Sequence, residues 1–207
     1  MAEIIGMETL LSICIGIGLS AACGFRIFVP PLVMSVASLF GHLTLSPNFA
    51  WMGTYPAMVA FAVATCIEVM AYYIPWVDNL LDTVATPMAI AAGTVVTASL
   101  IPDTDPMLQW TVALIAGGGA AGTIQAFTGI GRLASTVMTG GLGNALLSTI
   151  ESSSSVILSG LAIAAPVFAV CLVAVLLVFT LSKLGRGLAL RRERQAAALS
   201  SPENLNV

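Results

Sequence analysis

Residues 9–25, TLLSICIGIGLSAACGF, form an uncharged run of 17 residues between Glu8 and Arg26. A helix needs about 20 mainly apolar residues to cross the hydrocarbon core of a bilayer. With its immediate flanks this run is long enough, so we expect a first membrane span over residues 7–24. The acidic flank, which also holds Glu3, does not fit the positively charged start of a secretory signal.

The composition of the whole chain supports a membrane protein. Of 207 residues, 58% are apolar and 8% are Asp, Glu, Lys or Arg, with a formal net charge of −3, and the mean hydropathy is +1.01. Soluble domains carry roughly a quarter charged residues, so a water-soluble enzyme or binding module is excluded. The sparse basic residues disfavour a nucleic-acid partner, and the continuous apolar runs differ from the alternating strands of a membrane β-barrel. We expect an all-α, polytopic transmembrane helical bundle whose partner is the lipid bilayer.

The distances between charged residues predict the remaining spans. Five runs are long enough to cross the membrane: residues 7–24, 56–74, 84–101, 107–124 and 160–182. Two further helical segments, residues 26–41 and 126–140, are short for a crossing and are either tilted spans or re-entrant helices. Pro30 and Pro31 predict a helical break in the first of them. Glu151 and the four serines after it are expected in a wet loop that opens the last helix.

The basic residues predict the orientation of the chain. Five of the seven follow the last span, namely Lys183, Arg186, Arg191, Arg192 and Arg194. The positive-inside rule puts this end in the cytoplasm. Five and seven crossings are both odd, so the N-terminus is expected outside. We therefore expect a transmembrane domain over residues 1–185 and a basic, then disordered, cytoplasmic tail over residues 186–207.

Small residues recur every four positions in two of the expected spans. The positions are Ser12, Gly16, Ser20 and Gly24, and again Gly118 and Gly122. Such stripes let helix backbones approach closely, so we expect tight helix packing in the centre of the bundle, and a homo-oligomer through the same faces is compatible with them. Residues 21–26 can also be laid over residues 120–125, which is either an internal repeat of transporter halves or the common use of small residues in membrane helices.

Glu68 lies inside an expected span, where an acidic side chain costs about 3 kcal/mol on insertion scales. Such residues face the bundle interior and find partners, and Arg26 is the only basic residue in the first half of the chain. Two interpretations stay open. The two residues form part of a substrate, ion or proton path, or they only fix the packing of the helices, either as a buried ion pair or with a protonated Glu68 that donates to a carbonyl.

Other polar residues give weaker signals. Asp78, Asn79 and Asp82 follow the helix stop at Pro75; hard oxygen ligands of this kind suit Ca²⁺ or Mg²⁺, although helix capping beside a solvated loop is the simpler interpretation. Gln125 directly precedes the short segment 126–140, and Arg132 lies in its middle. Both are further candidates for the polar path. The single histidine and the four cysteines form no metal-binding pattern. We therefore predict no metal site, no cofactor and no catalytic residue.

These motifs, taken in order, resemble a bacterial integral-membrane family known as domain of unknown function 4126. The resemblance rests on the motifs Gly24-Phe25-Arg26, Val29-Pro30, Trp51-Met52-Gly53, Glu68, Ile74 to Asn79, Asp82 and Thr139 to Asn144, and it covers roughly residues 7–185. It implies a small multi-span protein of the bacterial cytoplasmic (inner) membrane and marks Arg26, Glu68, Asp78, Asn79 and Asp82 as parts of the pattern. It implies no activity.

The sequence leads to one main functional hypothesis and one alternative. We expect a small transporter, channel or lipid translocator with a polar path near Arg26 and Glu68, acting on a small solute, an ion or a lipid, and not an enzyme. The alternative is a non-transporting assembly or scaffold protein, in which the small-residue stripes bind other membrane subunits.

Overall fold

The computed structural model describes residues 2–101, 105–140 and 142–199. Within these ranges the chain is helical throughout, apart from short connections, and contains no strand. The expected all-α polytopic bundle is thereby confirmed.

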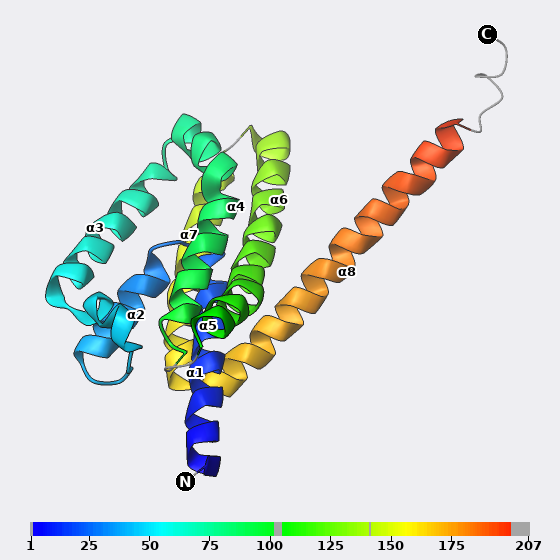
Figure 1. Cartoon of the computed structure of the whole chain (residues 1–207). Coiled ribbons are helices and arrows are strands. Elements are labelled where there is room, and N and C mark those ends of the chain that lie inside the picture. The colour runs from blue at the N-terminus through cyan, green and yellow to red at the C-terminus, as the bar shows by residue number, and fades with distance from the viewer. Residues whose placement is uncertain (1, 102–104, 141, 200–207) are drawn as a thin grey trace.

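The helices follow one another along the chain with short turns (Figure 1). Their bounds are α1 (Ala2–Cys23), α2 (Val29–Leu39), the 3₁₀ helix η1 (Pro47–Gly53), α3 (Tyr55–Ala71), α4 (Pro75–Ala98), α5 (Pro106–Val112), the π-helical turn η2 (Ala113–Gly118), α6 (Gly119–Thr139), α7 (Asn144–Ala164) and α8 (Pro166–Leu199). The N-terminal end of α1 and the C-terminal end of α8 lie at opposite ends of the molecule in Figure 1.

Four segments among the described residues are long and apolar enough to cross a membrane. They are Gly6–Cys23, Leu80–Ala98, Pro106–Thr139 and Asn144–Ala164. A fifth is added if η1 and α3, which bend by 65° at their junction, count as one span. The apolar helix α2 and the apolar part of α8, Pro166–Ser182, are shorter.

The expected boundary between residues 107–124 and 126–140 is wrong. The structure has one continuous helical segment over Pro106–Thr139, which runs through α5, η2 and α6. No proline interrupts it, and Gly117, Gly118 and Gly122 fit against α4. Gln125 and Arg132 are both buried inside it, so their polarity marks an interior face and not a helix end.

The expected wet loop at Glu151 is also wrong. Glu151 lies in the middle of α7 and is buried. The serines that suggested a loop bond to helix carbonyls, as Ser152 does to Ser148 at 2.8 Å and Ser153 to Thr149 at 2.9 Å. The following helix break falls at Pro166, which opens α8, so the expected span over residues 160–182 is divided between two helices.

The break predicted at Pro30 and Pro31 lies a few residues earlier. Both prolines occupy the first turn of α2, where a missing N–H costs nothing because the first helical N–H groups have no intrahelical acceptor. The non-helical backbone is therefore the short segment 24–28, between α1 and α2.

The small-residue stripe of α1 packs as expected. The Ser20 hydroxyl donates to the Gly93 carbonyl of α4 at 2.6 Å, and a Cβ atom added at Gly24 would lie 2.5 Å from the Ala121 carbonyl oxygen of α6. We call this contact of α1, α4 and α6 the small-residue seam. The two stretches proposed as a repeat thus meet in space, but residues 21–26 end a helix whereas residues 120–125 lie inside one.

Candidate functional site: a buried cluster of charged side chains

Arg26 lies in the segment between α1 and α2 and is 1% exposed. Its guanidinium group reaches α7. Nη2 donates to the Ser148 carbonyl at 2.9 Å and to the Ser148 hydroxyl, and Nε donates to the Ser152 hydroxyl at 3.0 Å. Nη2 also lies 3.7 Å from Oε2 of Glu151. The break after α1 therefore holds a cation against the polar face of α7.

A second arginine approaches the same carboxylate from α6. Arg132 Nε donates to Glu151 Oε1 at 3.0 Å, and its Nη2 donates to Oε2 in the parallel arrangement that arginine and carboxylate groups favour. Arg132 Nη1 lies 3.8 Å from Oδ1 of Asp82, on α4. Glu151 is thus shared by two arginines that come from opposite halves of the chain.

Tyr72, directly after α3, connects the two arginines on their other side. The Cζ atoms of Arg26 and Arg132 lie 4.1 and 4.2 Å from the centroid of its ring. Distances of this size are typical of cation–π contacts, which strengthen when water is excluded. Tyr72 is 7% exposed, so it is a buried part of this group. We call Arg26, Tyr72, Asp82, Arg132 and Glu151 the charge cluster.

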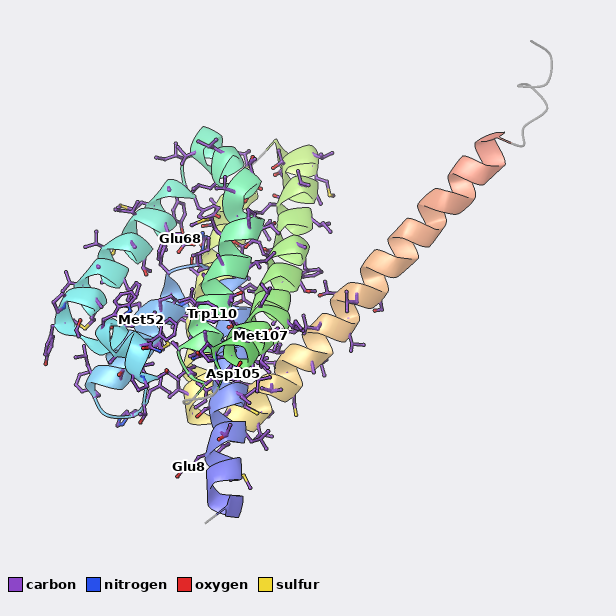
Figure 2. The ribbon with its side chains drawn as sticks, in the orientation of Figure 1. Glu8, Met52, Glu68, Asp105, Met107 and Trp110 are labelled. Atoms are coloured by element: carbon purple, nitrogen blue, oxygen red, sulfur yellow. The ribbon has the colours of Figure 1, made fainter. Side chains whose placement is uncertain are left out.

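Glu68 does not form the expected ion pair with Arg26. Its two carboxylate oxygens instead accept the backbone N–H groups of Ile27 and Phe28 at 2.8 and 3.1 Å. These N–H groups precede α2 and lie outside any helical ladder, so a carboxylate from α3 satisfies them. Figure 2 shows Glu68 on the side of α3 that faces the bundle. The sequence identified both residues but not the partners that the structure gives them.

The other candidates have different outcomes. Asp82 and Arg132 belong to the charge cluster. Gln125 is buried on α6, but no described hydrogen bond or ion pair joins it to the cluster. Asp78 and Asn79 lie in the first turns of α4, and their side chains fall outside the described part of the structure. Among the described residues no group of three or more His, Cys, Asp or Glu side chains is arranged to hold a metal ion.

Sequence reasoning missed Glu151 and its neighbouring serines. Ser148, Glu151, Ser155 and Ser159 are all buried on α7, and their spacing of three or four residues is that of one helix face. This periodicity was available in the sequence. It was hidden because a charged residue followed by four serines is typical of a solvated loop.

The charge cluster and Glu68 provide hydrogen-bonding and ionic groups but no nucleophile activated by a base. Two guanidinium and three carboxylate groups gather where α4, α6, α7, the end of α3 and the start of α2 meet. Within this described group, Nη1 of Arg26 is buried and has no hydrogen-bond partner. The arrangement is suited to holding an ion or a polar group inside the bundle.

An apolar cleft of about 300 Å³ adjoins Glu68. It lies between α3 and α4, and residues from both helices and from the segment before α2 line it. A second cleft of about 230 Å³ continues along the same gap and shares Ile27, Phe28 and Met88 with the first. The charged centre is therefore flanked by two apolar clefts along one side of the bundle.

Comparison with known proteins gives one match. The sequence model of a family described as "Domain of unknown function (DUF4126)" matches residues 13–186. No curated protein and no solved structure matches the chain significantly.

Proposed function

Since this chain belongs to the DUF4126 family, whose description carries no activity, we propose a function from the charge cluster itself. We propose that the protein is a small membrane transporter, and that the charge cluster forms the polar part of its path. The substrate would be a small solute, an ion or a lipid. The observation that carries this proposal is the convergence of two buried arginines and two carboxylates, Asp82 and Glu151, within a bundle of apolar helices.

The cost of such a cluster supports a functional role. Charged side chains at the centre of a bilayer cost about 3 kcal/mol each on insertion scales. Arg132 and Glu151 each lie seven residues from the nearest helix end, Thr139 and Asn144, which is about 10 Å of helix at 1.5 Å per residue. Apolar residues of similar volume often hold helices together as well as a buried ion pair does. A packing role alone therefore does not require these groups.

The backbone beside the cluster supports the same proposal. Residues 24–28 are not helical although they lie inside the bundle. Irregular backbone at membrane depth is tolerated where it is buried in protein or lines a cavity, and transporters use such broken helices at their substrate sites. Here the break presents Arg26, with its unpartnered Nη1 atom, to the interior.

We also propose that the protein lies in the bacterial inner membrane with its C-terminus in the cytoplasm. The ends of α1 and α8 lie at opposite ends of the molecule (Figure 1), which agrees with an odd number of crossings. The basic residues of the α8 end favour the cytoplasmic side for that end.

Transport is tested by reconstituting the wild type and two variants in liposomes. Glu151→Gln removes the charge that both arginines share, and Glu8→Gln makes the same change at an exposed position near the start of α1 (Figure 2). Fluxes of cations, anions and neutral solutes and the rate of lipid flipping are measured. We expect at least one wild-type activity above protein-free liposomes, a decrease of tenfold or more in Glu151→Gln, and no change in Glu8→Gln.

Wild-type activity equal to that of protein-free liposomes in every assay would contradict the proposal. Arg132→Lys keeps the positive charge but loses the two parallel hydrogen bonds to Glu151, so it tests whether transport needs the geometry of the pair as well as its charge. Size-exclusion profiles and unfolding midpoints of all variants are compared before their fluxes are interpreted.

A scaffold role is the second candidate, and one feature favours it. The apolar side chains Phe168, Val175 and Val178 of α8 are exposed along a helix that leaves the bundle (Figure 1). Another membrane helix could pack on this face. Cross-linking from Val175→Cys in native membranes would then capture a defined partner, while the flux assays would stay negative.

A further inference from the structure

The side of α3 that faces α4 is open. α3 packs mainly against α2 and η1, and the cleft beside Glu68 occupies the space toward α4. Its walls are apolar, and two of its lining residues, Ile67 and Met88, are 58% and 48% exposed. The cleft therefore opens sideways on the surface that the bilayer covers, so a molecule dissolved in the membrane can reach it directly.

Of the described residues that line the two clefts, only Glu68 carries a charge. It has no ion-pair partner within the described structure, because its oxygens accept only the N–H groups of Ile27 and Phe28. Each carboxylate oxygen has a second lone pair, so the group can still attract a donor or a cation. A single negative charge in the wall of an apolar cleft is complementary to a molecule that is apolar and carries one positive charge.

The neighbouring charges favour a cation over an anion at this position. The Arg26 and Arg132 guanidinium groups are bound to Glu151 and to the serines of α7, and both lie over the Tyr72 ring. Among these described carboxylates, Glu151 and Asp82 lie within 4 Å of a guanidinium group and Glu68 does not. Glu68 is therefore the carboxylate that an added cation would approach.

We propose that the cleft between α3 and α4 binds a hydrophobic organic cation, whose apolar body fills the cleft and whose charge lies against Glu68. The molecule would enter from the bilayer between the two helices. This inference rests on the proposed transport function, because it names the substrate class that the polar path would accept. Binding is measured without transport, so that the failure of one proposal is distinguished from the failure of the other.

The test uses two ions of matched size and shape, tetraphenylphosphonium and tetraphenylborate, which differ in the sign of their charge. Equilibrium binding of each is measured to the full chain in phosphatidylcholine nanodiscs, with empty nanodiscs as the background. We expect saturable binding of about one tetraphenylphosphonium per chain and none of tetraphenylborate. Glu68→Gln should weaken the binding at least tenfold, whereas Glu8→Gln should leave it unchanged.

A second pair of variants keeps the test valid if Glu68→Gln disturbs the fold. Ala64→Phe fills the cleft and leaves the Glu68 hydrogen bonds in place, whereas Val59→Phe adds an aromatic side chain to the same helix at an exposed position that lines neither cleft. We expect Ala64→Phe to weaken tetraphenylphosphonium binding at least tenfold and Val59→Phe to have no effect.

Three results would overturn the proposal. The first is no saturable binding by the wild type. The second is equal binding of both ions, which would mean that the cleft holds lipid tails without regard to charge. The third is wild-type affinity in Ala64→Phe. Saturable, Glu68-dependent binding with no flux in liposomes would instead support this site and contradict the transport function.

Discussion

The small-residue seam and the cleft beside α3 differ in residue size and pack in opposite ways. In the seam, Gly93 of α4 is so close to α6 that a Cβ atom would lie 2.6 Å from the Ala121 side chain. Beside α3, a space of about 300 Å³ remains between the helices. The comparison separates two tasks within one bundle. α1, α4 and α6 pack closely together, and α3 borders the cleft in which we propose that a ligand binds next to Glu68.

Removing the charge of Arg132 should have the largest effect on stability, because the charge cluster joins the seam helices α4 and α6 to the end of α3. Arg132→Leu leaves Glu151 buried without its closest partner, a change that costs about 3–5 kcal/mol in other proteins. We expect a clear decrease in the midpoint of thermal unfolding in detergent. Adding Glu151→Leu should restore at least half of the loss, and an unchanged midpoint in the single variant would contradict the buried pair.

Added volume in the seam should have the next largest effect. Gly93→Ala puts a methyl group against Ala121 and 2.9 Å from the Gly117 carbonyl oxygen, and overpacking of this kind costs about 1–3 kcal/mol. Gly129→Ala, on α6, meets no atom within 4 Å and should gain up to about 1 kcal/mol from helix propensity. Unfolding midpoints in detergent measure the difference in stability between Gly93→Ala and Gly129→Ala. Equal midpoints would mean that the seam is loosely packed.

Neutralising Glu68 should have a smaller and more local effect. Glu68→Gln keeps one oxygen acceptor but turns an amide N–H₂ group toward Ile27 or Phe28, so that one backbone hydrogen bond is lost, at a cost of about 1 kcal/mol. Hydrogen exchange at these two amides should become faster, while the amides of α1 keep their protection. Unchanged exchange at both positions would mean that the carboxylate does not hold the start of α2.

Filling the cleft should have the smallest effect on stability. Ala64→Phe extends into existing space between α3 and α4, so its unfolding midpoint should stay close to the wild type, within about 0.5 kcal/mol. A loss as large as that expected for Gly93→Ala would show that the two sides of the bundle are packed alike.

The sequence predicts those parts of the fold in which hydrophobicity and local chemistry agree. The uncharged run 9–25 predicts α1, and its small residues predict the seam, because close helix contact depends on side-chain size alone. Pro30 and Pro31 indicate a break near the start of α2. They do not show that the Glu68 carboxylate accepts hydrogen bonds from the N–H groups just before that helix.

The errors arise where a polar residue is paired with a distant one. Glu151 suggested a loop because its charge was considered alone, whereas Arg132, 19 positions earlier, makes burial in α7 tolerable. Tyr72 gives no signal in the sequence, since its contacts with two arginines depend on segments that are remote in sequence. Pairing across a bundle depends on the tertiary structure. The hydropathy of the sequence does not predict it.

The most direct test of the proposed polar path is whether a polar reagent reaches the charge cluster. Single cysteines are introduced at Ser152 beside Arg26, at Ser20 in the seam and at the exposed loop residue His42, in a chain whose four native cysteines are replaced. A small charged thiol reagent is applied to the protein in membranes. We expect modification of Ser152→Cys and His42→Cys but not of Ser20→Cys. Modification of His42→Cys alone would mean that the cluster is as dry as the seam, and the proposed polar path would be contradicted.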